Sequence, residues 1–207
     1  MSGIDLAGKL ITLEGLDFTG KSTVARLLET RLLDAGHVVI VTREPGGTPV
    51  GERVRSLLLT REHAEMLPLS ELLLFMVSRA QHAHEVILPA LREGKTVLTS
   101  RYRLSSLAYQ GYGRGIDLEL IRTLNAAATE GREEDIAFVI DVPVEIALGR
   151  KHGEGDRIEG AGDPFYQRVR SGYLQLAAEN AHVQTVDGTR PVERVCSDIL
   201  DRLDLAF

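Results

Sequence analysis

The sequence predicts an α/β fold in which a five-stranded parallel sheet carries helices on both faces. Two observations support this prediction. Short, mostly apolar runs alternate with longer segments in which apolar residues recur at helical spacing. Strands and helices that alternate in this way favour parallel strands joined by helical crossovers. The 207 residues show no repeat and no Pro- or Gly-rich linker, so one domain over residues 1–207 is expected.

The expected strands are short and mostly apolar, and the segments between them have the apolar spacing of helices. Strands are expected over 10–13 (LITL), 37–42 (HVVIVT), 95–99 (KTVLT), 136–142 (IAFVIDV) and 183–186. Helices are expected over 23–35, 50–59, 67–91 with an interruption near Pro89, 118–128, 165–178 and 192–205. Ligands of such sheets bind beyond the carboxyl ends of the strands, so functional residues are expected in the segments that follow each strand.

Composition excludes several classes of protein. The 24 lysines and arginines stand against 30 acidic residues, and this net charge of −6 does not suit a protein that wraps nucleic acid. Cys196 is the only cysteine, which excludes a disulfide framework and a Cys-based zinc cluster. No apolar run reaches the roughly 20 residues of a membrane span, and no signal-peptide pattern opens the chain. A cytoplasmic protein without a nucleic-acid or membrane partner is expected.

The basic residues comprise 20 arginines and only 4 lysines. Codon usage in a GC-rich genome would explain this skew. A need for bidentate contacts with phosphate is the other explanation. The positions of the arginines, and not the net charge, distinguish the two.

The segment after the first strand, residues 15–22 (GLDFTGKS), fits the phosphate-loop pattern G-x4-G-K-[ST] between a strand and a helix. Its glycines let backbone N–H groups converge on phosphate, and the helix N-terminus adds a positive dipole end. Lys21 is expected to reach the β- and γ-phosphates, and Ser22 to offer a hydroxyl to Mg²⁺. The pattern predicts a P-loop NTPase fold with an ATP or GTP site formed by Gly15, Leu16, Asp17, Phe18, Thr19, Gly20, Lys21, Ser22 and Thr23.

This loop alone does not name the reaction, because GTPases, motors and small-molecule kinases share it. A GTPase would need an N-K-x-D run to bind the base, and the sequence has none. The short chain without further domains favours a small-molecule kinase.

The run T-R-E-P-G-G-T at residues 42–48 resembles the thymidylate kinase family. Further pieces of that family's pattern follow in order: FMVSRAQH at 75–82, RYRLSSLAYQGYGRG at 101–115 and DRIE at 156–159. The resemblance extends from about residue 9 to residue 186. It implies phosphoryl transfer from ATP to dTMP, giving dTDP and ADP for dTTP biosynthesis, with Mg²⁺ and usually in a homodimer.

Three arginines, Arg43, Arg79 and Arg101, follow or face the ends of the second and third strands. Their guanidinium groups suit an acceptor phosphate, although any one of them alone fits a solvated surface position. Phe75 precedes Arg79 by four residues, so the two can share one face of a helix. Stacking on a base and packing in the core are both open to Phe75.

The resemblance implies more specific roles for these residues. Phe75 would stack on thymine, with Arg79 on the base or phosphate, and Tyr109 would exclude a ribose 2′-hydroxyl. Asp17 would contact the sugar 3′-hydroxyl and help to order the metal and the phosphates. The implied substrate-binding set is Asp17, Arg43, Phe75, Arg79, Arg101, Ser105, Ser106, Tyr109, Gln110 and Glu159.

Residues 149–162 combine glycines with cations, which is typical of a mobile lid, although a charged surface turn is the alternative. Closure would bring Arg150 and Arg157 onto the transferring phosphoryl group. Because Phe18 takes the place of an arginine in the loop, the chain resembles the lid-armed bacterial type. Asp156 and Glu159 match lid acids that face the substrate. The implied catalytic set is Asp17, Lys21, Arg101, Arg150 and Arg157, whereas His82, His84 and His152 do not form a metal-ligand set.

The sequence departs from the family at three positions. Ser100 and Ser78 stand where aspartates are usual, and Phe18 is bulkier than the usual loop residue. Mg²⁺ would then be held by Ser22, Asp17 and phosphate oxygens, since this ion keeps much of its water shell. The alternatives are another nucleoside or nucleotide kinase, or a nucleotide-binding homologue that Ser100 has weakened.

Overall fold

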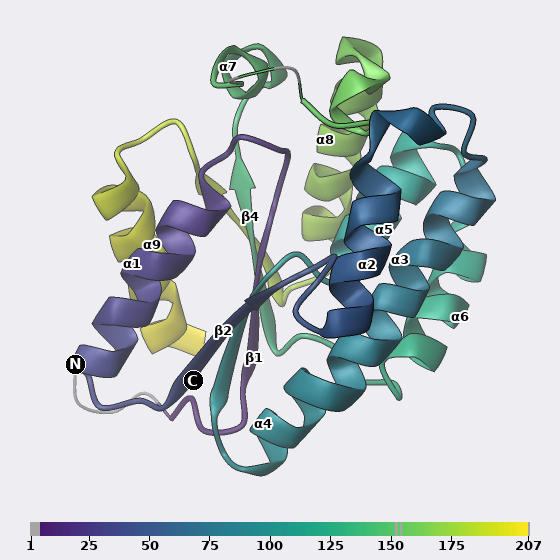
Figure 1. The fold of residues 1–207 in the computed structure, drawn as a ribbon. Helices are drawn as coiled ribbons and strands as arrows, with labels where there is room; N and C mark the ends of the chain where they lie inside the picture. Colours follow the sequence, from purple (N-terminus) through teal and green to yellow (C-terminus); the bar gives the residue numbers. More distant parts are fainter. Residues whose placement is uncertain (1–4, 152, 154, 207) are drawn as a thin grey trace.

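The computed structural model describes residues 5–151, 153 and 155–206 (Figure 1). In this part of the chain five parallel strands form one sheet in the order β2-β3-β1-β4-β5. The strands are β1 (Leu10–Glu14), β2 (Val39–Arg43), β3 (Thr96–Ser100), β4 (Ile136–Asp141) and β5 (Val183–Asp187). The predicted α/β fold is therefore confirmed.

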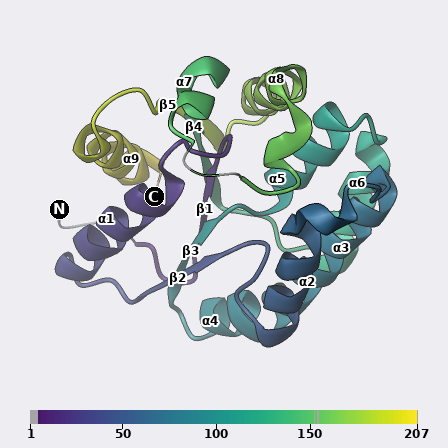
Figure 2. The ribbon, with the colours of Figure 1, turned by 45° about the horizontal axis from the view of Figure 1, so that its top comes forward.

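Helices cover both faces of the sheet (Figures 1 and 2). On one face, α1 (Lys21–Asp34) packs on α9 (Val192–Ala206) over a core that includes Ile11 and Leu13 of β1. On the other face lie α2 (Pro49–Leu59), α3 (Pro68–His82), α6 (Leu118–Ala128) and α8 (Asp163–Glu179). Within the described ranges, no helix is long and apolar enough to cross a membrane.

The predicted helix over 67–91 is interrupted, but one turn earlier than expected. A π-helical turn, η2 (Ala83–Ile87), joins α3 to the short helix α4 (Leu88–Arg92). Pro89 lies in the first turn of α4; in a continuous α-helix its ring would clash with the carbonyl four residues before it, and its nitrogen has no hydrogen to donate. The wide turn directly before α4 gives the chain the room that this proline requires.

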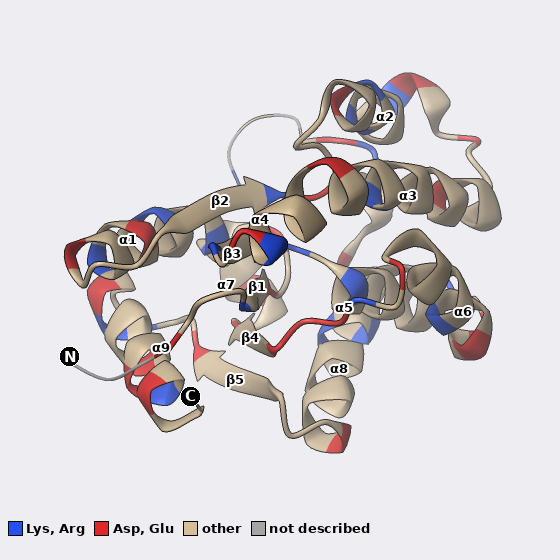
Figure 3. Cartoon of the chain, turned by 90° about the horizontal axis from the view of Figure 1, so that it is seen from below, with Lys and Arg blue, Asp and Glu red and all other residues tan. Residues whose placement is uncertain are grey.

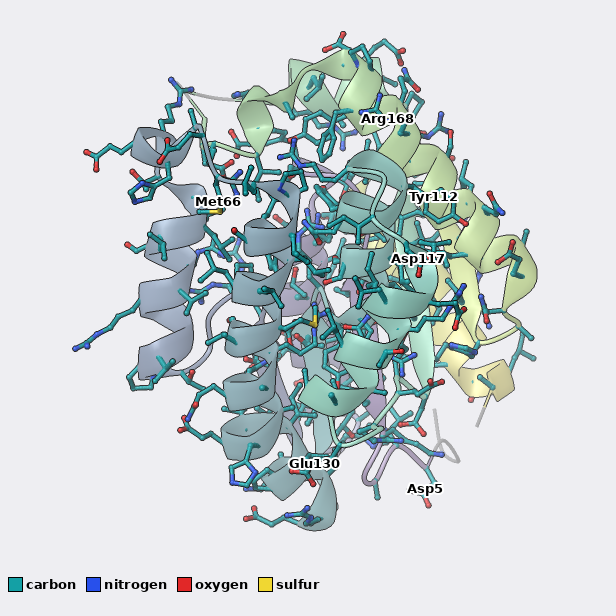
Figure 4. All side chains as sticks on the ribbon, turned by 90° about the vertical axis from the view of Figure 1, so that its right-hand side faces the viewer. Asp5, Met66, Tyr112, Asp117, Glu130 and Arg168 are labelled. Carbon is teal, nitrogen blue, oxygen red and sulfur yellow. The ribbon has the colours of Figure 1, made fainter. Side chains whose placement is uncertain are left out.

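A second π-helical segment, η3 (Leu107–Gly113), follows α5 (Arg103–Ser106) and was not predicted. It packs closely on α8: a Cβ atom on Gly113 would lie 2.6 Å from the Phe165 ring. Figure 4 looks onto this contact, where Tyr112 of η3 lies next to α8, the helix that carries Arg168. Short segments of this kind lack a long apolar period, and α7 (Val144–Gly149), η1 (Arg61–His63) and η4 (Glu159–Ala161) were missed for the same reason.

The expected lid lies between α7 and α8. Its described residues after α7 have irregular backbone followed by η4, and α8 begins directly after the lid. His152 and Glu154, which belong to the predicted lid, lie outside the described residues, as do 1–4 and 207. Figure 3 shows acidic and basic segments side by side on α1, α2 and α9.

Candidate active site

Two adjoining cavities lie at the carboxyl edge of the sheet in the described part of the molecule. The inner cavity is lined by Asp17, Glu44, Pro45, Arg55, Leu59, Phe75, Arg79, Arg101, Ser105, Ser106, Tyr109, Gln110, Asp156 and Ile158. The loop cavity is lined by Asp17, Phe18, Gly20, Lys21, Ser22, Thr23, Arg43, Glu44, Arg55, Ser100 and Arg101. Asp17, Glu44, Arg55 and Arg101 line both cavities. Two ligands, one in each cavity, would therefore meet at these four side chains.

The phosphate loop curves around the start of α1. Gly20 precedes the helix with φ 88°, and no side chain of the described residues caps the helix N-terminus. The N–H groups of this first turn are thus available to an anion. Gly15 lies so close to β4 that a Cβ atom there would be 2.6 Å from the Ile140 carbonyl oxygen, so only glycine fits.

Lys21 is folded back onto the loop. Its Nζ donates to the carbonyl oxygens of Leu16 at 2.5 Å and Gly15 at 3.3 Å, and the side chain is almost fully buried. Burial, together with the charge of Arg101, lowers the pKa of Lys21 to about 7. A polyphosphate in the loop cavity would supply the negative charge that favours the protonated amine.

Arg101 lies at the junction of the two cavities. Its Nη2 donates to Asp17 Oδ1 at 2.6 Å and to the Tyr109 hydroxyl at 2.9 Å. Its backbone has φ 70°. This conformation is unfavourable in free energy for any residue with a side chain, and it persists where the surrounding structure holds it. Burial alone would raise the pKa of Asp17, but Arg101 and Lys21 hold it below its ordinary value. Asp17 is therefore an ionised partner for this arginine.

Glu14, the last residue of β1, supports Arg101 through the hydroxyl groups of Ser105 and Tyr173. Its carboxylate accepts hydrogen bonds from the Tyr102 backbone N–H at 2.8 Å, Ser105 Oγ at 2.6 Å and the Tyr173 hydroxyl at 3.0 Å. Ser105 Oγ and the Tyr173 hydroxyl in turn accept from Arg101 Nη1. Burial raises the pKa of Glu14. Sequence reasoning missed this residue, although a carboxylate that closes an otherwise apolar strand was a usable signal.

Arg79 is buried and most of its donors are engaged. Its guanidinium donates to Glu44 at 2.7 Å, Ser106 at 2.8 Å, Asn125 at 2.5 Å and the Tyr102 carbonyl at 2.8 Å. Arginine has five N–H donors, so these four contacts with described residues leave one Nη2 hydrogen for a ligand in the inner cavity.

Glu44 joins this network to the second strand. Besides Arg79, it bonds His82 Nδ1 at 3.1 Å, and His82 Nε2 contacts Thr42 Oγ1 at 2.7 Å. Burial alone would raise the pKa of Glu44, whereas Arg79 and His82 hold it below its ordinary value. His82 therefore supports a buried carboxylate. Sequence reasoning gave Glu44 no role, although it lies inside the T-R-E-P-G-G-T run.

The structure brings most of the predicted substrate residues together. Asp17, Phe75, Arg79, Arg101, Ser105, Ser106, Tyr109 and Gln110 all line the inner cavity. Arg43 lines the loop cavity, with its guanidinium 2.9 Å from Glu52. Arg55, which the sequence analysis left without a role, lines both cavities and donates to the Pro45 carbonyl at 3.0 Å.

The predicted lid residues lie elsewhere in this conformation. Arg150 is exposed, with its guanidinium 3.3 Å from the Gly188 carbonyl, and Arg157 is paired with Glu71 at 2.7 Å. Neither arginine lines either cavity of the described structure. Glu159 accepts from the Asp156 N–H at 3.1 Å, and it is Asp156 that lines the inner cavity. Burial and Asp156 raise the pKa of Glu159.

Two of the three departures from the family pattern lie at the loop cavity. Ser100 and Phe18 line the loop cavity, and Phe18 adopts φ 64°. Ser78 Oγ instead accepts the Gly46 backbone N–H at 3.1 Å and so holds the turn after β2.

The donor set of the loop cavity suits a magnesium ion carried mainly by phosphate oxygens. The described residues contain no group of three or more His, Cys, Asp or Glu side chains that would hold a metal. Ser22 is exposed to the cavity, whereas both Asp17 oxygens accept hydrogen bonds from Arg101, Tyr109 and Tyr166. A hydroxyl and a water-rich shell are compatible with the octahedral preference of Mg²⁺.

Comparison with known proteins decides the family. A sequence profile described as thymidylate kinase matches residues 13–199. The chain belongs to the thymidylate kinase family. A thymidylate kinase of Pelotomaculum thermopropionicum is 46% identical over 199 residues, which cover 94% of this chain and 92% of that protein. One of Deinococcus radiodurans is 47% identical over 195 residues, covering 93% and 94%.

A crystal structure of thymidylate kinase from Ehrlichia chaffeensis matches with a TM-score of 0.77 and 34% identity, covering 95% of this chain and 98% of that one. The chain is thus an ATP-dependent nucleoside-monophosphate kinase. The reaction of the thymidylate kinase family is the phosphorylation of dTMP to dTDP.

Proposed function

We propose that this chain phosphorylates dTMP by holding it in the inner cavity while the loop cavity holds the phosphates of ATP. The observation that carries the proposal is the junction formed by Asp17, Glu44, Arg55 and Arg101, which line both cavities. A donor and an acceptor phosphate would meet there between fixed cations. Positioning and charge neutralisation then supply the rate, because phosphoryl transfer needs little covalent chemistry from the protein.

In the inner cavity, Phe75 would stack on thymine, and the remaining Nη2 hydrogen of Arg79 would donate to the base or phosphate. Tyr109 and Asp17 would face the deoxyribose. Arg101 and Arg55 would bind the acceptor phosphate from the junction, with Arg43 at its outer edge. The polar lining that remains for the nucleoside is Ser105, Ser106 and Gln110.

In the loop cavity, the N-terminus of α1 and Lys21 would bind the β- and γ-phosphates. Ser22 would offer its hydroxyl to Mg²⁺, with Asp17 ordering the site through Arg101. Mg²⁺, when bound, would neutralise part of the phosphate charge. The Gly15–Thr23 backbone would provide the rest of the phosphate contacts.

The lid, about residues 149–162, would close over this cavity within the single domain 1–207. Arg150 is the lid guanidinium that closure would carry towards the transferring phosphoryl group, since it is exposed and, among the described residues, donates to the Gly188 carbonyl. Glu159 pairs with Lys151 at 3.4 Å and would face the substrate only after closure.

Two further properties belong to this proposal. A homodimer would cover the aliphatic face formed by Leu57 of α2 with Leu69, Leu73 and Val77 of α3, all of which are substantially exposed. A cytoplasmic location is expected with the small-molecule substrates and is tested by cell fractionation.

A coupled ADP-release assay with ATP, Mg²⁺ and each monophosphate in turn tests the function. We expect dTMP to give the highest kcat/KM, and we expect Lys21→Met to abolish turnover. Preference for a different monophosphate would favour another nucleotide kinase. Binding of both ATP and dTMP without dTDP formation would favour a weakened homologue.

A further inference from the structure

The part of the lid directly before η4 is fastened to the end of α2. We call residues 155–158 the lid root. The Arg157 backbone N–H donates to the Leu59 carbonyl at 3.0 Å, and Arg157 Nε donates to the Leu58 carbonyl at 2.9 Å. Arg61 Nε donates to the Gly155 carbonyl at 2.9 Å. The lid root is therefore tied to α2 and η1 through both backbone and side chains.

Glu71 of α3 adds a buried ionic contact to this attachment. Its carboxylate accepts from Arg157 Nη1 at 2.7 Å, from Arg114 at 3.0 and 3.2 Å and from Gln110 Nε2 at 2.9 Å. Burial alone would raise the pKa of Glu71, but Arg114, Gln110 and Arg157 hold it below its ordinary value. One ionised carboxylate thus joins α3, η3 and the lid root.

The segments joined in this way form one wall of the inner cavity. Leu59 comes from the end of α2, Gln110 from η3, and Asp156 and Ile158 from the lid root. Arg157 and Glu71 line neither cavity, but each is bonded to or adjacent to a residue that does. Breaking a buried ion pair of this kind costs several kcal/mol, so the lid root has a strong tendency to stay in place.

We propose that Arg157 and Glu71 are positioning residues that build the dTMP-binding wall, so that Arg157 fixes the lid root instead of acting on the transferring phosphoryl group. This inference rests on the proposed function, because it assigns dTMP to the inner cavity. The lid root would then be the fixed end of the lid. Arg157 would set the affinity for the acceptor, and Arg150 would act in the chemical step.

The two roles have different kinetic signatures. Loss of a wall weakens the ground state and the transition state alike, which raises KM and leaves kcat unchanged. Loss of a transition-state cation lowers kcat. We expect Arg157→Gln to raise the KM and the Kd for dTMP about 10-fold while kcat and the KM for ATP change by less than about 2-fold.

Arg150→Gln is the matched control, because it removes a lid guanidinium outside the contact with Glu71. We expect it to lower kcat and to leave the Kd for dTMP unchanged. A calorimetric titration with dTMP alone measures this Kd without turnover. If Arg157→Gln lowers kcat more than about 10-fold with an unchanged Kd for dTMP, the proposal is wrong.

The partner variant tests whether Arg157 acts through Glu71. If it does, Glu71→Gln also raises the Kd for dTMP. The double variant Arg157→Gln/Glu71→Gln then raises this Kd no further than the single variant with the larger effect, because contacting residues are coupled. Strictly additive effects would contradict the proposal. Thermal unfolding checks each variant, and if Glu71→Gln does not fold, Arg157→Gln with its Kd decides alone.

Failure of the proposed function is recognised separately, from the wild-type chain. Should it prefer another monophosphate, the same variants are measured with that acceptor. A rise in its Kd then supports the wall, and an unchanged Kd overturns it.

Discussion

In the free protein the charged form of Lys21 is energetically unfavourable, and a bound phosphate would stabilise it. Its amine is nearly buried among carbonyl oxygens, and its pKa is lowered to about 7 from an ordinary 10.5 because burial and Arg101 disfavour the charge. As the pH rises, the folded protein therefore loses this proton at a much lower pH than the unfolded chain does. Phosphate binding would favour the protonated amine again. The observed binding free energy of ATP is therefore reduced by the free energy needed to protonate Lys21.

This difference predicts a pH-dependent stability. Between about pH 7 and 10 the unfolded chain binds more protons at Lys21 than the folded chain, so the free energy of unfolding rises with pH. Lys21→Met lacks this contribution. We expect the stability of the wild type relative to this variant to increase by about 2 kcal/mol between about pH 7.5 and 9. Urea unfolding at several pH values measures it, and a difference that stays constant or shrinks contradicts the assignment.

Ser100 is the second residue-level test. It ends β3, lines the loop cavity and supplies no charge where the family usually has aspartate. We expect Ser100→Asp to raise kcat several-fold and to lower the Mg²⁺ concentration needed for half-maximal rate, because a carboxylate holds the hydrated ion better than a hydroxyl. Ser100→Asn is the control without charge. An unchanged or lower kcat for Ser100→Asp would show that the missing carboxylate does not limit turnover.

The residues that the sequence could predict are those carried by short local patterns. The phosphate loop, Phe75 and Arg101 each belong to such a run, and the structure places each at a cavity. Glu14 and Glu71 were missed because their contacts come from segments far apart in the chain, as in the pairing of Glu14 with Tyr173. The prediction that Arg157 acts at the phosphates follows from the lid pattern, and no local pattern shows its contact with Glu71.

At the scale of elements, the long apolar periods were predicted well and the irregular ones were not. The helix over 118–128 is found with the bounds expected, whereas η3 lies in a segment for which the sequence predicted neither helix nor strand. In η3, glycines permit an approach to α6 and α8 that no apolar period reveals. Yet η3 carries Tyr109 and Gln110 into the inner cavity, so part of the site depends on the element that was hardest to predict.

The packing of η3 on α8 leads to an element-scale prediction. A Cβ atom on Gly172 of α8 would lie 2.6 Å from the Tyr112 ring. Alanine favours a helix by about 1 kcal/mol, but overpacking here costs about 1–3 kcal/mol. We expect Gly172→Ala to lower Tm and to raise the KM for dTMP, because η3 would move with Tyr109.

Gly149→Ala is the control for this prediction, because Gly149 is exposed and a Cβ atom there would meet no atom within 4 Å. It should leave both Tm and KM close to those of the wild type. A Gly172→Ala protein with wild-type Tm and KM would show that α8 and η3 can separate without consequence for the site.

At the scale of the whole molecule, α8 links the lid to both cavities. It begins directly after the lid, and its Tyr166 and Tyr173 reach Asp17 at 3.3 Å and Glu14 at 3.0 Å. These tyrosines are seven residues apart and share one helix face. A displacement of the lid end of α8 would therefore change the hydrogen bonds of Asp17 and Glu14, the carboxylates that hold Arg101.

The helical layer that carries the inner cavity also presents the aliphatic face proposed for the dimer. Leu69, Leu73 and Val77 are spaced by four residues on α3 and are 49%, 45% and 48% exposed. A charge placed in the middle of this face cannot be buried against a second copy without a large desolvation cost. We expect sedimentation of the wild type to give twice the chain mass of 22.7 kDa, and that of Leu73→Glu to give a single chain. Leu205→Glu is the control, since Leu205 is 87% exposed on α9, across the sheet from α3. If Leu73→Glu sediments as the wild type does, the dimer uses another face. If Leu73→Glu is monomeric and also binds dTMP more weakly, the second copy helps to hold α3, and with it Phe75 and Arg79, in the binding conformation.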